Sequence, residues 1–263
     1  MSETVRADYA LIGGTGLSDS NLISNSESYS IETAYGSVPV KIGDFAGKKI
    51  CFLARHGSDH SVPPHLINYR ANIMALKQLG VSKVIATAAV GSLNEAMGPN
   101  HFIIADQFLD FTKNRVSTFH QGGPEGVVHV DVTEPYCGSV RKVLIEAIKE
   151  VKKEKPEIAF HETGNYVTCE GPRFETPAEI KMFKMLGGDL VGMTSVPECV
   201  LAKEADLCYA NISYVTNFAA GISKHPLTHQ EVLDATADNF ENLQSIIFKA
   251  FELMGQSGCC QEQ

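Results

Sequence analysis

The sequence predicts an α/β protein: one domain over residues 1–254, folded as a three-layer α/β sandwich with a mixed central sheet, followed by a flexible tail over 255–263. Two observations support this prediction. Short apolar runs typical of strands alternate with amphipathic segments typical of helices along the chain. The 22 glycines and 11 prolines are scattered, and no linker-like stretch or internal repeat divides the 263 residues.

The first half of the chain is expected to supply most of the strands. Residues 81–89 are almost continuously apolar, which suits a strand covered on both faces of its sheet. The segment 68–79 has apolar residues spaced for one face of a helix, and Gly80 is a typical helix end. Four other strands are expected here: one begins at Tyr9, and three cover 38–42, 49–54 and 102–111. A turn over 43–47 joins the strands over 38–42 and 49–54.

The second half is expected to be richer in helices. It opens with a polar stretch over 112–134, which is too long for a simple connector, and loops of that length are usually functional. The last helix is expected to start at Thr228, where Thr228 and Glu231 form a capping box, and to end near Met254. The remaining helices are expected over 136–153, 177–186 and 197–205, and the remaining strands over 166–169, 190–193 and 207–216.

The net charge of −9 argues against nucleic acid and anionic membranes as partners, because an acidic surface repels both. No apolar run approaches the roughly 20 residues that span a bilayer. The first residues lack the basic and long apolar regions of a secretory signal, so a cytoplasmic location is expected.

The seven cysteines do not form a metal site, because no C-x-x-C pair with zinc spacing occurs. Most lie in apolar segments and are expected to be small buried hydrophobic residues. The terminal pair Cys259 and Cys260 either joins the tail to the body or remains free. A free tail is favoured, because the cytosol keeps thiols reduced.

Two strand ends carry residues suited to an anion. Glycines at 13–16 let the backbone approach an anion, and Thr15 adds a hydroxyl donor, although a tight structural turn is an equal alternative. Arg55 has the rigid fork that clamps phosphate or carboxylate, and His56 is expected to donate to the same anion. The alternative for Arg55 is a surface position.

A third strand end, at 193–198, offers donors from Thr194 and from a helix N-terminus. Taken alone, this segment is better explained by an ordinary helix N-cap.

Two further strand ends suit a nitrogen heterocycle. In the segment 170–175, Phe174 can stack on a planar ring and Glu175 can accept from ring N–H groups. The alternative is a helix-entry turn in which Glu175 favours the helix N-terminus. Asn217 ends the strand over 207–216 and can bond a ligand, or it can form a turn before Gly221. Together the strand ends describe a site that holds phosphate beside a nitrogen heterocycle.

At these residues the sequence resembles the trimeric purine nucleoside phosphorylase and methylthioadenosine phosphorylase family. The resemblance covers nearly the whole chain and implies the nucleoside phosphorylase-like fold. It also implies a homotrimer or a dimer of trimers with sites near subunit interfaces, and inorganic phosphate as co-substrate without a metal or organic cofactor. The segments that carry it are 12–17, 55–57, 68–72, 170–174, 192–198 and 216–217.

The resemblance also implies roles for individual residues. Phe174 would lie against the purine and Met193 against the ribose. His129, in the long polar loop, would reach the 5′ end of the nucleoside in the neighbouring subunit, and His229 would bond a 5′-hydroxyl. Many relatives have Thr or Asn at the position of Ala88, so a phosphate contact there must come from backbone N–H groups. The implied phosphate site consists of Thr15, Arg55, His56, Ala88, Ala89 and Thr194.

The base loop favours 6-oxopurines. Members that act on 6-aminopurines have a Thr-Asp-x-Asp pattern there, whereas this chain has Asn217 and Ala219, with Glu175 after Phe174. Glu175 can accept from the N1–H of a 6-oxopurine but would face the lone pair of adenine N1. Buried groups left unpaired cost about 1–3 kcal/mol each, which gives roughly 10-fold to 100-fold discrimination.

Inosine or guanosine is therefore the expected substrate. Methylthioinosine is a further candidate, because the segment 68–72 is similar to the methylthio branch. Methylthioadenosine phosphorolysis is the alternative. A water-using nucleosidase and a non-catalytic nucleoside-binding protein are rivals, and the phosphate residues argue against both. Asn217 and Glu175 are the expected catalytic residues, with Asn217 stabilising the purine as it leaves.

Overall fold

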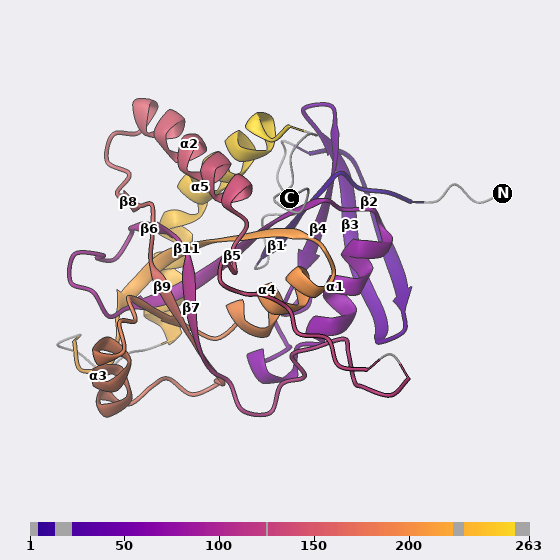
Figure 1. Ribbon diagram of the computed structural model, residues 1–263. Coiled ribbons are helices and arrows are strands. Elements are labelled where there is room, and N and C mark those ends of the chain that lie inside the picture. Colours follow the sequence, from indigo (N-terminus) through magenta and orange to yellow (C-terminus); the bar gives the residue numbers. More distant parts are fainter. Residues whose placement is uncertain (1–4, 14–22, 125, 223–228, 256–263) are drawn as a thin grey trace.

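A computed structural model describes residues 5–13, 23–124, 126–222 and 229–255. They form an α/β fold around an 11-stranded mixed sheet (Figure 1). The strand order is β2-β3-β4-β1-β5-β10-β9-β7, while β11 pairs with β5 and β6, and β6 pairs with β8. The strands are β1 (Tyr9–Gly13), β2 (Ser24–Thr33), β3 (Gly36–Phe45), β4 (Lys48–Ala54), β5 (Lys83–Ser92), β6 (Phe102–Ile104), β7 (Gln107–Phe111), β8 (Phe160–His161), β9 (Asn165–Cys169), β10 (Leu190–Gly192) and β11 (Cys208–Phe218).

Helices cover both faces of the central strands, so the predicted three-layer arrangement is confirmed. On β1, Tyr9 and Leu11 pack into one core with α2 and α5, while Ala10 and Ile12 pack into the other core with α1 and α4. This is the alternation of side chains expected of a strand buried on both faces. The helices are α1 (Tyr69–Gln78), α2 (Gly138–Glu154), α3 (Pro177–Met185), α4 (Ser195–Glu204) and α5 (His229–Leu253), with a short 3-10 turn at Pro64–Leu66.

Local sequence signals set the helix ends. The side chain of Asn68 accepts from the N–H of Ala71 and starts α1, and Gly80 follows that helix with a φ of 77°. Helix α3 begins with a capping box between Thr176 and Glu179. Glu175 is not part of that box, which leaves its carboxylate for other contacts. The capping box expected at Thr228 lies outside the described residues.

Three expectations about strands are corrected. The segment 102–111 is not one strand: β6 pairs with β11, whereas β7 pairs with β9, because the chain changes neighbours at Ala105 and Asp106. Strand β2 was not expected, because it is an exposed edge strand whose sequence is mostly polar. The strands around the expected turn over 43–47 extend further into it, and the reversal occurs at Ala46 and Gly47.

The cysteines and the hydropathy add two observations. Cys51, Cys169 and Cys199 are buried free thiols, as expected. Cys208 differs, because it is disulfide-bonded. Within the described ranges, no helix combines the length and the apolar character needed to cross a membrane.

Candidate active site

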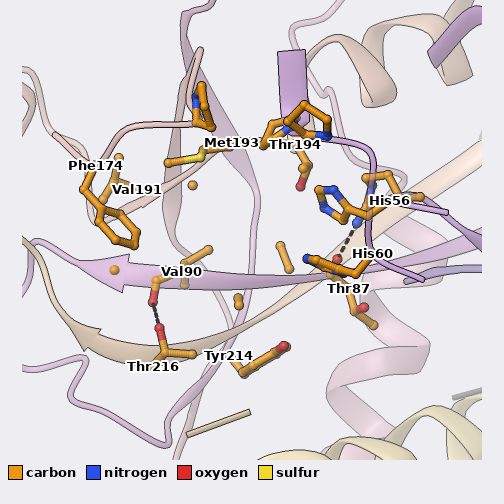
Figure 2. A pocket seen from close by; sticks show the side chains of 18 of the residues that line it. His56, His60, Thr87, Val90, Phe174, Val191, Met193, Thr194, Tyr214 and Thr216 are labelled. Carbon is orange, nitrogen blue, oxygen red and sulfur yellow. Dashed lines mark hydrogen bonds between the residues drawn. The ribbon is translucent and has the colours of Figure 1, made fainter. Parts of the chain in front are cut away.

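The parallel strands β1, β4, β5 and β11 bring their carboxyl ends to one edge of the sheet, where a cavity of about 730 Å³ opens. Figure 2 shows Phe174 at one side of this cavity and His56 with His60 at the other. Its lining includes most residues expected at the site, namely Arg55, His56, Ala88, Ala89, Phe174, Glu175, Met193, Thr194, Asn217 and Ala219. The strand ends predicted separately from the sequence therefore lie around one space.

The floor of the cavity is a stretch of β5 with an open edge. Strand β5 pairs with β1 up to Ala86 and with β10 from Gly91, and between them no described strand pairs with that edge. Its other edge is paired with β11 throughout. Backbone groups alternate between the two edges of a strand, and the carbonyl of Thr87 bonds Arg55 on the open edge. The N–H of Ala89 therefore faces the cavity, whereas the N–H of Ala88 faces β11.

Arg55, at the end of β4, is held by a buried ion pair. Its Nε and Nη2 atoms donate to the two carboxylate oxygens of Glu198 at 2.6 and 2.7 Å, and Nη1 donates to the carbonyl of Thr87 at 3.0 Å. The hydroxyl of Tyr209 donates to the same carboxylate at 2.8 Å. Burial alone would lower the pKa of Arg55, but the charge and hydrogen bonds of Glu198 raise it above its ordinary value. A guanidinium has five N–H donors, so this arrangement leaves two for a ligand.

His56 does not fit the donor role expected for it. Its Nδ1 lies 2.8 Å from the carbonyl oxygen of Val62, which can only accept, so the ring N–H points at Val62. Burial lowers the pKa of His56 to about 4, which keeps the imidazole neutral. The ring of His60 packs against it with a centroid distance of 4.6 Å.

Thr194 precedes α4 but does not act as an ordinary N-cap. Its side chain makes no capping hydrogen bond, although the residue is only 6% exposed and lines the cavity. The strand before it approaches Tyr166 so closely that a Cβ on Gly192 would lie 2.0 Å from the tyrosine hydroxyl. Only glycine fits at 192, and this contact fixes the position of Met193 and Thr194 beside β5.

The opposite side of the cavity offers an aromatic ring, a carboxylate and an amide. Phe174 is 41% exposed and faces the cavity (Figure 2). One carboxylate oxygen of Glu175 is buried without a hydrogen-bond partner among the described residues, and burial raises the pKa of this group. Asn217 accepts from the hydroxyl of Thr216 at 2.7 Å and donates one amide N–H to the carbonyl of Phe218 at 2.9 Å. Its second amide N–H remains for a ligand.

Arg115, in the long polar loop, joins the segments that surround the cavity. Its side chain is 2% exposed and donates to the carbonyls of Cys169, Glu170, Met193 and Val196. It also donates to the hydroxyl of Tyr69 on α1 at 3.0 Å. One buried guanidinium thus connects the loops that follow β9 and β10 to a helix. Apart from the length of the loop, no feature of the sequence indicates this role.

Comparison with known proteins identifies the fold family. Residues 8–252 match the model of the phosphorylase superfamily. The chain belongs to this superfamily. It is 52% identical over 241 residues to the probable 6-oxopurine nucleoside phosphorylase of Moorella thermoacetica, covering 92% of this chain and 91% of that protein. It is 45% identical over 256 residues to the 6-oxopurine nucleoside phosphorylase of Pyrococcus furiosus, covering 95% and 94%.

A solved structure gives the same result. The crystal structure of a methylthioadenosine phosphorylase from an antarctic soil metagenomic library matches with a TM-score of 0.90 and 36% identity, covering 97% of this chain and 89% of that one. The match to this phosphorylase confirms the nucleoside phosphorylase-like fold.

Three of the expected site residues are not at the cavity or cannot be placed there. Thr15 lies outside the described residues, and so does the side chain of His229 at the start of α5. His129 is exposed and does not line the cavity of its own chain, so its expected role in a neighbouring subunit stays a prediction. Glu198, Tyr209 and Arg115 support the lining residues from outside the cavity, and no sequence pattern indicated these roles.

Proposed function

We propose that this protein is a purine nucleoside phosphorylase that acts on 6-oxopurine nucleosides and uses inorganic phosphate as co-substrate. The products are the free base and ribose 1-phosphate. The observation that carries the proposal is that one cavity is lined both by Arg55, whose guanidinium keeps two N–H donors for a ligand, and by Glu175, which has a carboxylate oxygen without a hydrogen-bond partner among the described residues. The names of the similar proteins support the same reaction class.

The base side suits the hydrogen bonds of inosine and guanosine. An ionised Glu175 can accept from the N1–H of a 6-oxopurine, which supplies the partner that its buried oxygen lacks. The remaining amide N–H of Asn217 can donate to purine N7 or O6. Phe174 can lie against the ring. Adenine would present a lone pair at N1 to Glu175, so 6-aminopurines are disfavoured.

In the proposed reaction the C1′–N9 bond breaks first and its electron pair leaves with the purine. A phosphate oxygen then forms the new bond to C1′ of the oxocarbenium-like ribose. Asn217 stabilises the negative charge that develops on the purine, a preorganised electrostatic role. The two remaining donors of Arg55, the Ala89 N–H and the Thr194 hydroxyl hold phosphate near C1′, which converts a bimolecular attack into a positioned one.

Product analysis tests the proposal. Inosine, guanosine, methylthioinosine and methylthioadenosine are each incubated with the protein, with and without phosphate. We expect phosphate-dependent release of hypoxanthine and guanine, with little adenine. Release without phosphate would indicate a nucleosidase, and binding without release would indicate a non-catalytic nucleoside-binding protein. Preferential cleavage of methylthioadenosine would refute the roles given to Glu175 and Asn217.

The Asn217→Ala variant tests the division of labour within the site. It should lower kcat by roughly 10²- to 10³-fold, the usual effect of removing one preorganised donor. The KM for phosphate should change much less, because Asn217 lies on the base side of the cavity. Equal losses in both parameters would contradict the assignment.

The 5′ end of the substrate and the assembly are also part of the proposal. Faster phosphorolysis of methylthioinosine than of inosine would argue against His229 as the partner of a 5′-hydroxyl. We propose a cytoplasmic homotrimer or dimer of trimers in which His129 reaches the neighbouring site, with residues 1–254 as the phosphorylase domain. Sedimentation analysis tests the assembly. His129→Ala should raise the KM for the nucleoside and leave the KM for phosphate unchanged if this reach occurs.

A further inference from the structure

The position of the ring proton of His56 is fixed by its hydrogen bond. Nδ1 lies 2.8 Å from the carbonyl oxygen of Val62, and a carbonyl has no hydrogen to give. Nδ1 must therefore carry the proton in the neutral ring. The hydrogen bond that the ring makes within the described residues is the one at Nδ1, so Nε2, the other polar atom of the ring, is left for a ligand in the cavity that His56 lines. In the neutral ring, Nε2 offers only a lone pair.

The surroundings of His56 favour the neutral ring. Burial is the largest cause that lowers the pKa of His56, to about 4, and the charges of Arg55 and His60 lower it further. The hydrogen bond to Val62 and the charge of Glu198, on α4, act in the opposite direction and do not outweigh burial. At neutral pH the ring is an acceptor toward the cavity.

The other groups on this side of the cavity are donors. Arg55 has two N–H groups left, the Ala89 N–H faces the open edge of β5, and the Thr194 hydroxyl makes no capping bond. The charge of Arg55 is already balanced by Glu198, which is fully buried. No lysine is among the described residues that line the cavity. This side therefore distinguishes anions by hydrogen-bond pattern more than by charge.

We propose that His56 is a specificity-determining residue for the anion, and that its Nε2 accepts the hydrogen of the P–O–H group of phosphate. Both hydrogen phosphate and dihydrogen phosphate carry such a hydrogen, and arsenate does as well. Sulfate has the same shape but is fully deprotonated at neutral pH, so one of its oxygens would face the lone pair of Nε2. The site thereby selects phosphate over sulfate. This inference rests on the proposed function, which makes phosphate the co-substrate.

Calorimetric titration of the full-length protein without nucleoside tests the inference with phosphate, arsenate and sulfate. Phosphate and arsenate should bind with similar affinity, and sulfate should bind roughly 10-fold to 100-fold more weakly, as expected when a buried acceptor loses its partner. In His56→Gln, the amide nitrogen can donate where Nε2 accepts. The preference for phosphate over sulfate should then fall at least about 10-fold.

His60→Gln is the matched control, because it makes the same substitution in the ring that packs against His56. It should retain the preference for phosphate. If sulfate binds the wild-type protein as well as phosphate does, or if His56→Gln keeps the full preference, the inference is wrong. The same holds if only His60→Gln loses the preference. A wild-type protein that binds both anions equally and still cleaves inosine would overturn this inference alone and leave the proposed function intact.

The tautomer can be observed directly, without relying on a variant that folds. Nitrogen-15 NMR of histidine-labelled wild-type protein should show the His56 ring protonated at Nδ1 and unprotonated at Nε2 at neutral pH. The signal is assigned by its loss in His56→Gln, or by its response to phosphate but not to sulfate. Protonation at Nε2, or at both nitrogens, in the free protein would overturn the inference.

Discussion

Replacing Glu198 by glutamine removes one charge from an ion pair that is shut off from water. The Arg55 side chain is 3% exposed and that of Glu198 is 0% exposed, and they share two short hydrogen bonds. Glutamine keeps the volume and can still accept from Nε, but its NH₂ group then faces a donor of the guanidinium. The positive charge of Arg55 is left buried without its counter-charge.

The expected cost follows from this burial. Removing one partner of a buried ion pair costs about 3–5 kcal/mol, because the other charge remains desolvated. At about 2–4 °C per kcal/mol for a chain of this size, the melting temperature should fall by roughly 6–20 °C. Phosphate-dependent activity should fall as well, since the orientation of the two free N–H groups of Arg55 depends on this pair. The measurements are scanning calorimetry, urea unfolding and the KM for phosphate.

A second variant separates the pair from its environment. Replacing Arg55 and Glu198 by methionine, together with Tyr209→Phe to remove the hydroxyl that bonds Glu198, leaves only the carbonyl of Thr87, at the cavity edge, without the donor that Arg55 supplied. Apolar replacement of a whole buried ion pair is often neutral or stabilising. This variant should recover most of the stability lost in Glu198→Gln and show no phosphorolysis. The reasoning is refuted if Glu198→Gln unfolds within about 1 kcal/mol of the wild type, or if the triple variant is as unstable as the single one.

Glu175→Gln should lower kcat/KM for inosine yet raise the melting temperature, because burial raises the pKa of Glu175 and its ionised form destabilises the free protein above that pKa; lower stability in this variant would contradict the assignment. For the same reason, wild-type kcat/KM for inosine should fall as the pH drops through the raised pKa. Arg115→Met should raise the KM for nucleosides and lower the unfolding free energy by at least about 3 kcal/mol, since several buried carbonyls lose their donor; unchanged kinetics would limit Arg115 to stability. Burial and then His161 lower the pKa of His101, whose ring bonds that of His161 at 3.0 Å. Because neutral His101 is favoured in the folded state, its contribution to the free energy of unfolding is complete above about pH 6.5 and is lost as the pH falls. In His101→Phe, the free energy of unfolding measured with urea should lack this pH dependence.

The elements that the sequence predicted well are those whose burial has a regular period. Residues 83–89 of the strand expected over 81–89 lie in β5, which is buried on both faces, and the apolar spacing of 68–79 corresponds to α1. Strand β2 was not predicted, because an edge strand buries little surface and its sequence is therefore polar. The break between β6 and β7 was not predicted, because the residues on both sides of Ala105 have the apolar pattern of a strand. The change of neighbouring strand at this point is a tertiary effect that the local pattern does not show.

The candidate site was predictable to the level of strand ends, and not to the level of individual protons. Arg55, Glu175 and Asn217 each follow an expected strand with a side chain suited to an anion or a heterocycle, and they line one cavity. The partner of Arg55 was not predictable, because Glu198 lies 143 residues away in the chain. His56 was expected to donate to the anion, whereas its ring N–H bonds the carbonyl of Val62. A composition of arginine beside histidine suggests two donors, and only the carbonyl of Val62 shows where the ring proton lies.

These corrections change how the anion side of the cavity must work. A site that attracted phosphate by charge alone would leave its cations uncompensated, yet the one arginine in the described lining shares a fully buried carboxylate with Tyr209, and the adjacent histidine is kept neutral. Balanced charges make the protein without bound phosphate more stable, because no buried cation lacks a counter-charge. They also reduce the attraction for any dianion, so affinity must come from directed donors and one acceptor.

The same logic holds on the base side. The unpartnered oxygen of Glu175 makes the empty site less stable, and only a base with a hydrogen at N1 supplies the missing hydrogen bond. Both halves of the reaction would thus be selected by where the ligand carries a hydrogen, phosphate by its P–O–H and the purine by its N1–H.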